Sequence, residues 1–162
     1  MSALVVPPIR YSMTLEVPAR RAFDAFTRGI GAWWPAENTW AKGGLAAMVL
    51  EPRPGGRWFE RDASGVERSW GRVLSCSVPQ RIVLGWGVSP EWKPEADPRR
   101  ASRVEVRFVP QTLASVRVDL EHRDFGNHGA GVEALRRALA GEKGWANLLA
   151  RYREATVGQR SS

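Results

Sequence analysis

Cysteine and histidine are scarce in this sequence, and their scarcity excludes several kinds of site. The single cysteine, Cys76, excludes an internal disulfide and fits the reducing cytoplasm as the expected location. With two histidines, a metal site would need carboxylates for most of its ligands, and no spacing of Asp and Glu indicates one. Neither a phosphate-binding glycine loop nor a dinucleotide-binding fingerprint occurs. We therefore expect no metal and no cofactor, and a structural role for Cys76.

Long hydrophobic runs and blocks of like charge are also absent. No apolar run approaches the roughly 18 residues that span a membrane, and residues 1–11 lack the basic and hydrophobic parts of a signal peptide. The net charge of +7 comes from many arginines and few lysines, which are scattered along the chain. Because no basic cluster marks a nucleic-acid surface, we expect no nucleic-acid and no membrane partner, and we place the arginines on solvated faces.

The length and composition are those of one globular domain. The chain has 162 residues, of which 43% are hydrophobic and 25% charged, which is enough for a sizeable core. No repeat, linker or low-complexity segment divides it. We interpret residues 1–162 as a single domain with tails at 1–8 and 157–162, present as a monomer or a homodimer.

The spacing of hydrophobic residues predicts an α+β domain. Alternation with period 2 marks residues 9–17 as a strand, and two short helices follow at 19–28 and 30–34. Turns rich in Gly and Pro separate the later strands, which we place at 45–50, 58–61, 67–77, 81–88, 103–109 and 115–122. Residues 89–102 read as a long loop at the rim of the fold, and a helix is expected at 132–139. Helices segregated from a meandering antiparallel sheet define the α+β class.

The closing helix, residues 144–155, is the element around which we expect the chain to be organised. Its large side chains recur at helical spacing on one face, namely Trp145, Leu148, Leu149 and Tyr152. Apolar surface left in water is unfavourable by about 25 cal/mol per Å², so this face should cover the sheet. We expect Trp145 and Leu149 to pack on the sheet, with any cavity between them and three residues of the strands, Trp58, Trp86 and His122.

Tryptophan is the one residue type in clear excess. The chain holds eight: Trp33, Trp34, Trp40, Trp58, Trp70, Trp86, Trp92 and Trp145. Tryptophan is unfavourable to expose and rarely fits a small core completely. The excess therefore suits a fold with a large interior surface, and a cavity lined by aromatic side chains binds apolar or aromatic small molecules.

Five segments resemble, in the same order, the proteins related to the C-terminal domain of the activator of Hsp90 ATPase. They are Val17–Pro35 (VPARRAFDAFTRGIGAWWP), Pro54–Glu60 (PGGRWFE), Trp70–Gly87 (WGRVLSCSVPQRIVLGWG), Val116–Phe125 (VRVDLEHRDF) and Lys143–Tyr152 (KGWANLLARY). This activator of Hsp90 ATPase homologue 1-like family lies within the START-like, Bet v 1-like superfamily. The resemblance implies a helix-grip fold, in which a curved antiparallel sheet wraps around a long C-terminal helix. It also implies two short helices after the first strand and a cavity between sheet and helix.

One motif departs from the family pattern. The family's usual His-x-Gly-Gly-Trp reads Gly-Glu-Lys-Gly-Trp at residues 141–145, so the Gly-Trp pair is kept and the histidine is missing.

The expected site is mostly aromatic, with few polar groups. His122 ends an alternating strand and should point inward, where a histidine can act as an acid or base near neutral pH. Arg72 and Glu60 are its candidate polar companions, whereas His128 lies in a Gly-rich turn and is expected to be exposed. The alternative is that the tryptophans and His122 simply fill the core. The candidate ligand-binding residues are Trp34, Trp58, Trp70, Arg72, Trp86, Phe108, Leu120, His122, Trp145 and Leu149.

Three functions of different classes remain open at this point. The leading interpretation is a START-like domain that binds a hydrophobic or aromatic small molecule between the sheet and the C-terminal helix. The family resemblance implies a second, a module that binds an Hsp90-type chaperone and stimulates its ATPase. Because some START-like relatives are cyclases, a cofactor-independent enzyme with His122 as the acid or base is the third.

Overall fold

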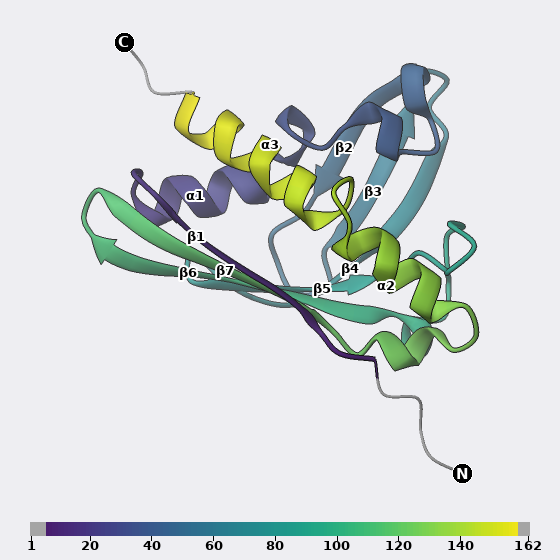
Figure 1. The fold of residues 1–162 in the computed structure, drawn as a ribbon. Coiled ribbons are helices and arrows are strands. Elements are labelled where there is room, and N and C mark those ends of the chain that lie inside the picture. The colour runs from purple at the N-terminus through teal and green to yellow at the C-terminus, as the bar shows by residue number, and fades with distance from the viewer. Residues whose placement is uncertain (1–5, 159–162) are drawn as a thin grey trace.

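The computed structural model describes residues 6–158, which form one curved antiparallel sheet closed on a C-terminal helix (Figure 1). The strands are β1 (Ile9–Leu15), β2 (Leu45–Leu50), β3 (Arg57–Asp62), β4 (Glu67–Ser77), β5 (Arg81–Trp86), β6 (Ser102–Thr112) and β7 (Ser115–Arg123). The α-helices are α1 (Ala19–Phe26), α2 (Val132–Ala140) and α3 (Trp145–Gly158). Short 3-10 helices are η1 (Ile30–Ala32), η2 (Ala36–Asn38), η3 (Lys42–Gly44), η4 (Pro98–Arg100) and η5 (Phe125–His128).

The strands lie in the sheet in sequence order, except for β1, which pairs with the last strand, β7. Among the described residues the strand order is β1-β7-β6-β5-β4-β3-β2, and every neighbouring pair is antiparallel. Strands consecutive in sequence from β2 to β7 are neighbours, because each pair is joined by a turn or loop, while β1 returns to pair with β7. This is the helix-grip fold, so the fold predicted from the sequence is confirmed.

The chain ends differ from the prediction on one point. Helix α3 continues to Gly158, so the tail predicted at 157–162 begins inside a helix. The rest of that tail, residues 159–162, lies outside the described residues, as do residues 1–5 of the tail predicted at 1–8.

Two bulges interrupt β4 and change the direction of its side chains. Trp70 has no partner in the pairing with β3, and Leu74 has none in the pairing with β5. A bulge adds one residue to one strand and re-aims the side chains around it, so Trp70 is buried whereas Arg72 and Leu74 are exposed. Gly71 permits the close approach, since a Cβ there would lie 1.8 Å from the carbonyl oxygen of Gly85. Arg72, expected as a polar companion of His122 at the site, is therefore placed on the other face of the sheet.

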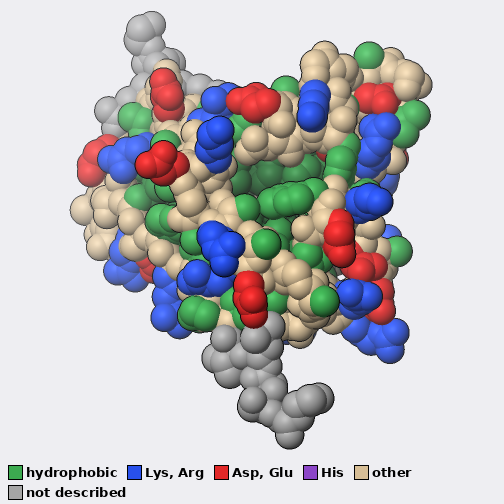
Figure 2. Space-filling model, turned by 45° about the vertical axis from the view of Figure 1, so that its right-hand side comes forward, with side chains coloured by type: hydrophobic (Ala, Val, Ile, Leu, Met, Phe, Trp, Pro, Cys, Tyr) green, Lys and Arg blue, Asp and Glu red, His purple; other side chains and the backbone are tan. Residues whose placement is uncertain are grey.

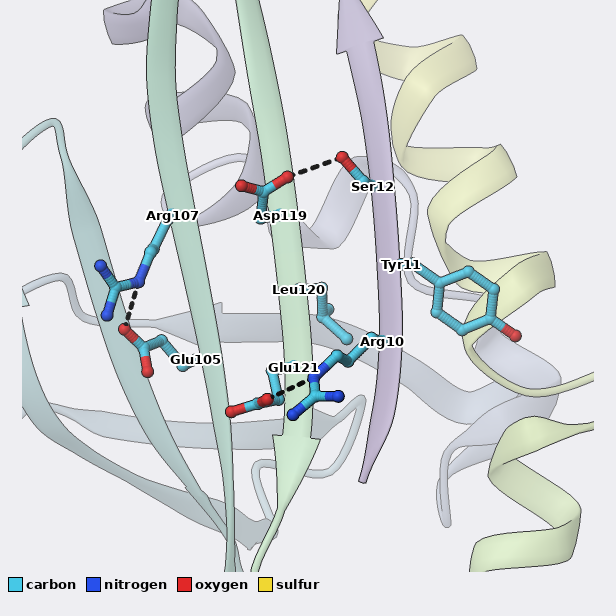
Figure 3. A pocket seen from close by; sticks show the side chains of 8 residues that line it. All are labelled: Arg10, Tyr11, Ser12, Glu105, Arg107, Asp119, Leu120 and Glu121. Carbon is cyan, nitrogen blue, oxygen red and sulfur yellow. Dashed lines mark hydrogen bonds and ion pairs between the residues drawn. The ribbon is translucent and has the colours of Figure 1, made fainter. Parts of the chain in front are cut away.

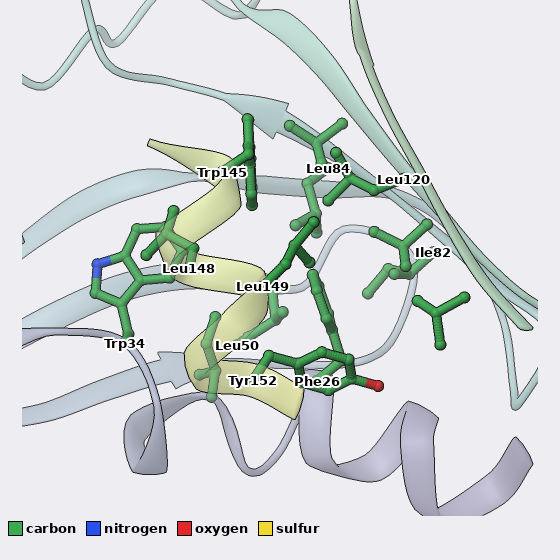
Figure 4. Packing of buried hydrophobic residues seen from close by; sticks show 14 of the residues in the cluster. Phe26, Trp34, Leu50, Ile82, Leu84, Leu120, Trp145, Leu148, Leu149 and Tyr152 are labelled. Carbon is green, nitrogen blue, oxygen red and sulfur yellow. The ribbon is translucent and has the colours of Figure 1, made fainter. Parts of the chain in front are cut away.

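The apolar face of α3 packs into the concave side of the sheet, as its spacing predicted. Trp145, Leu148, Leu149 and Tyr152 are each at most 3% exposed. Figure 4 shows this face of the helix surrounded by side chains from the strands and from α1. The Tyr152 hydroxyl donates to the carbonyl oxygen of Ala22 at 2.7 Å, which satisfies its polar atom and ties α3 to α1.

Replacing Leu149 with Ala should lower the free energy of unfolding by about 2–5 kcal/mol, because the removed side chain leaves a cavity inside a packed core. Leu148→Ala should cost less, since Leu148 also borders an open cleft and water can fill the space it leaves. Urea unfolding followed by circular dichroism measures both. The control is Arg153→Ala, on the exposed side of α3, which should stay within about 0.5 kcal/mol of the unmodified chain. A Leu149→Ala effect as small as that of the control would show that α3 does not hold the core together.

Candidate ligand-binding cleft

All eight tryptophans belong to one connected cluster. Trp33 adjoins Trp34 with 5.8 Å between ring centroids, and Trp92 joins through its carbonyl oxygen, which accepts from Trp40 Nε1 at 2.7 Å. The other indole rings contact one another with centroids 4.7–6.4 Å apart: Trp34, Trp40, Trp58, Trp70, Trp86 and Trp145. Because these residues come from three strands, three loops and α3, the cluster exists only in the folded chain.

One side of the cluster is open and forms a cleft of about 430 Å³. Residues 37–42 form its rim, and the end of α2, residues 143–144 and Leu148 form the facing wall. Figure 2 shows a hollow with a hydrophobic floor, bordered by charged side chains. The tryptophans that line the cleft are Trp34, Trp40, Trp70, Trp86 and Trp92. The volume and the aromatic walls are typical of small-molecule sites.

A buried carboxylate holds the rim of the cleft against the cluster. Glu60, on β3, is fully buried, and its oxygens accept from the backbone N–H groups of Trp40 at 3.0 Å and Ala41 at 2.8 Å. A third donor is the indole N–H of Trp70 at 2.8 Å. Three donors replace the hydration that the carboxylate loses on burial. Glu60, expected as a polar group of the cavity, thus anchors residues 40–41 and Trp70.

The backbone of the cleft is strained at two positions. Three non-glycine residues among those described have positive φ, and two of them line the cleft: Lys42 at 48° and Trp92 at 62°. This left-handed conformation costs of order 1–3 kcal/mol for such residues and tends to persist where a site requires it. Both strained positions thus lie on the wall of the cleft.

A directed chain of hydrogen bonds lies behind the cleft. Trp145 Nε1 donates to His122 Nδ1 at 3.0 Å, so the proton of the neutral His122 ring is on Nε2. That nitrogen lies 2.7 Å from the hydroxyl of Ser102, and the same hydroxyl lies 2.7 Å from Nε2 of His128. The Ser102 hydroxyl therefore accepts from His122 and donates to His128, whose own proton is on Nδ1.

The two histidines of this chain are buried and neutral. His122 is inaccessible to solvent, and burial holds its pKa well below the ordinary value. His128 is 1% exposed, and burial lowers its pKa to about 4. Its Nδ1 has no acceptor among the described residues. The predicted exposure of His128 is wrong, because η5 folds the 125–128 turn against Ser102 rather than outward.

The structure places the predicted ligand-binding residues at different depths. At the cleft surface are Trp34, Trp70 and Trp86. Behind them, in contact with their rings, are Trp58, Trp145 and His122. Buried in the core without lining the cleft are Phe108, Leu120 and Leu149. The cleft opens beside Leu148, because Leu149 lies one residue further round the helix and faces the sheet.

Arg72 lies away from the aromatic cleft. The bulge shifts the alternation of side chains along β4, so Arg72 lines a separate groove of about 560 Å³ on the other face of β4 and β5. Its guanidinium approaches the carbonyl oxygen of Gly55 at 3.5 Å.

Several cleft residues escaped prediction because they lie in loops or depend on tertiary contacts. Trp40 and Trp92 lie in loops. The periodic spacing of hydrophobic residues predicts which side chains of a strand or helix are buried, but it carries no information about loop residues. Lys42, Lys143 and Leu148 also line the cleft. The one signal in the sequence was the excess of tryptophan.

A third hollow, of about 510 Å³, lies on the outer face of β1, β7 and β6 and is charged (Figure 3). Arg10 pairs with Glu121 at 2.7 Å and Arg107 with Glu105 at 2.7 Å. Burial raises the pKa of Glu105, but hydrogen bonds from Arg81 and Arg123 outweigh this effect and lower the pKa to about 2. Because its charged groups neutralise one another, this surface stabilises the sheet and offers no free charge to a ligand.

Residues 6–158 contain no group of three or more His, Cys, Asp or Glu side chains placed to hold a metal ion. Within the same range, none of the helices has the length and hydrophobicity needed to cross a membrane.

A curved antiparallel sheet that grips a C-terminal helix, with an aromatic cleft beside that helix, defines a START-like helix-grip domain. The chain belongs to the activator of Hsp90 ATPase homolog 1-like protein family, whose model matches residues 16–155. Among proteins with curated descriptions, none matches this sequence.

Solved structures with similar chains differ in what their names describe. The anthrahydroquino-γ-pyrone synthase Txn09 is 33% identical, with a TM-score of 0.67 over 93% of this chain and 97% of its own. The self-sacrificing resistance protein CalC from Micromonospora echinospora is 30% identical, with a TM-score of 0.68 over 93% and 94%. PFC0360w, an HSP90 activator from Plasmodium falciparum, is 20% identical, with a TM-score of 0.54 over 93% and 96%, and shows the shared fold alone.

Replacing Glu60 with Gln should lower the free energy of unfolding by about 1–3 kcal/mol, because the amide nitrogen cannot accept and leaves buried N–H groups unpaired. The rim should also loosen, which would change the fluorescence of Trp40 and Trp70. Glu37→Gln, at an exposed position of the same rim, is the matched control and should change stability by less than about 0.5 kcal/mol. Equal stability of the two variants in urea unfolding would contradict this role of Glu60.

Acid should destabilise the fold through His128. Its folded pKa of about 4 lies below its ordinary value of 6.5, so between these pH values the unfolded chain binds a proton that the folded chain excludes. The free energy of unfolding should therefore fall as pH falls from 6.5 towards 4, with His122 acting in the same direction. Urea unfolding at a series of pH values measures the slope.

The variant His128→Gln keeps every carboxylate, so the titration of carboxylates affects the variant and the unmodified chain alike. A difference between their pH dependences then comes from His128. Between pH 7 and pH 5 the stability of the variant should fall less steeply than that of the unmodified chain. Parallel curves for the two proteins would show that His128 titrates alike in the folded and unfolded states.

Proposed function

We propose that this domain binds an aromatic small molecule in the tryptophan cleft. The observation that carries the proposal is a cleft of about 430 Å³ lined by five of the eight tryptophans of the chain. Aromatic rings of a ligand can pack edge-to-face or offset-stacked on such walls, at about 0.5–1.5 kcal/mol per pair beyond the buried area.

Unpaired donors in the walls support the same proposal. The indole N–H groups of Trp34 and Trp86 are buried and have no acceptor among the described residues. The Trp34 nitrogen lies on the side of its ring away from Leu148 and α3 (Figure 4). The indole N–H of Trp58, behind the cleft, is unpaired as well. Buried polar groups normally have partners, so the donors of Trp34 and Trp86 offer partners to a carbonyl or phenol oxygen of a ligand that displaces the side chains covering them.

The similar structures agree with this chemistry. The name of Txn09 describes a synthase of an anthrahydroquinone fused to a pyrone, which is a polycyclic aromatic system bearing oxygen atoms. Because Txn09 is 33% identical to this chain over nearly the whole of both chains, we extend its class of aromatic compound to the ligand of this chain.

His122 is poorly placed for the enzymatic alternative. It is inaccessible to solvent, and both of its ring nitrogens are engaged, one by Trp145 and the other by Ser102. A general acid or base must reach the proton that it transfers. His122 instead orients the Trp145 indole that supports the cleft wall.

The family name favours a second candidate, a module that binds an Hsp90-type chaperone. A stimulation of chaperone ATPase by the purified domain would support it. Absence of both binding and stimulation would remove it, without affecting the small-molecule proposal.

The neutral fluorophore N-phenyl-1-naphthylamine should bind the unmodified domain, with a rise in its own emission and quenching of tryptophan emission. Trp92→Ala should weaken this binding about tenfold, equivalent to 1.4 kcal/mol, because it removes one aromatic wall. Trp92 lies in a loop and is 43% exposed, so the fold should survive its loss.

The control is Leu113→Ala, which removes an exposed hydrophobic side chain from the turn between β6 and β7 and should leave the affinity unchanged. The proposal fails if neither this probe nor any of a panel of polycyclic aromatic compounds binds or raises the melting temperature.

A further inference from the structure

The lysines of this chain have an unusual distribution. Only three of its 24 basic residues are lysines: Lys42, Lys93 and Lys143. Lys42 and Lys143 line the tryptophan cleft from opposite walls, one on the rim and the other just before α3. Lys93 directly follows Trp92, which also lines the cleft. Two of the three lysines therefore lie at one site, whereas the arginines are distributed over the whole surface.

The lysines also differ from the arginines in their partners. Every ion pair found among residues 6–158 is made by an arginine, and the ammonium groups of the three lysines make neither an ion pair nor a hydrogen bond there. Many of the arginines are thus engaged in ion pairs within the protein, while the charges of Lys42 and Lys143 at the cleft remain available to a ligand.

Among the side chains that line the cleft, positive charges outnumber negative ones, and the carboxylate of Glu60 behind the rim is engaged by three N–H donors. Glu37 is the one acidic residue among those that line it, against Lys42 and Lys143. An ammonium group is a compact charge on a flexible stem, so it can follow an anionic oxygen at the mouth while the aromatic part of the ligand lies deeper.

The backbone at Lys42 gives independent support. Lysine occupies a left-handed position with φ of 48°, immediately before Gly43 and Gly44, where glycine would carry no such strain. Backbone strain of this kind clusters at active sites and ligand clamps.

We propose that the cleft takes an aromatic anion, with its rings among the tryptophans and its oxyanion, a phenolate, carboxylate or sulfonate, between Lys42 and Lys143. This inference rests on the proposed function and narrows it from aromatic compounds in general to acidic ones. The two are tested separately by a pair of probes that share one ring system.

The neutral probe is N-phenyl-1-naphthylamine, and the anionic probe is 8-anilinonaphthalene-1-sulfonate, which carries the same anilinonaphthalene skeleton with a sulfonate added. The anionic probe should bind about fivefold to tenfold more tightly at low salt. Raising the salt from about 50 to about 500 mM should remove most of this preference, because the charges are exposed and screened. Affinity for the neutral probe should not change.

Variants assign the preference to the lysines. The double substitution Lys42→Gln with Lys143→Gln should lower the affinity for the anionic probe to that of the neutral one, and Lys42→Arg with Lys143→Arg should restore part of it. Glu37→Gln should strengthen binding of the anion. Arg117→Gln removes one positive charge from the outer face of β7 and is the matched control, with no expected effect. Circular dichroism and the melting temperature establish that each variant is folded.

The outcomes are distinguishable. If neither probe binds, the proposed function fails together with this inference. If the neutral probe binds but the anionic one binds no better, or if the lysine variants leave the preference intact, the inference is overturned and the aromatic site stands.

Discussion

The packing of α3 against the concave face of the sheet is the constraint on which the rest of the structure depends. The sheet curves because its seven described strands must enclose one helix, and the helix presents Trp145, Leu149 and Tyr152 to it. Those side chains are too large to be accommodated by a flat sheet, and their burial supplies much of the apolar area that stabilises the domain. The cleft lies where the end of α2 and the start of α3 meet the tryptophans of the strands and of the rim loops.

Polar atoms decide how such an aromatic interior is arranged. Each indole N–H in it needs an acceptor, and the fold supplies Glu60 for Trp70, His122 for Trp145 and a main-chain oxygen for Trp40. Satisfied in this way, these rings are held in single orientations. Three buried indole N–H groups find no acceptor among the described residues, those of Trp34, Trp58 and Trp86. The rings that line the cleft include both kinds, because the N–H groups of Trp40 and Trp70 are paired whereas those of Trp34 and Trp86 are not.

Charge is divided between two parts of the molecule by residue type. Arginines on the strands pair with carboxylates across the outer face of the sheet, as around Glu105, and keep that face solvated and rigid. Lys42 and Lys143 line the cleft and make no ion pair among the described residues. The planar guanidinium suits fixed, bidentate pairing, whereas an ammonium is a compact charge on a flexible stem.

The sequence by itself determined the α+β class, the order of the elements and the buried face of α3, because period-2 and helical spacing report directly on which faces are apolar. The helix-grip architecture came from the ordered family resemblance. The spacing also placed His122 inward. Only the tertiary structure decided the site. A bulge at Trp70 sent Arg72 to the opposite face, because a bulge shifts the alternation at a point that strand pairing decides. A short 3-10 turn buried His128, which its Gly-rich surroundings suggested was exposed. The cleft itself is made of loop residues such as Trp40 and Trp92, whose positions follow from long-range contacts that no local pattern encodes.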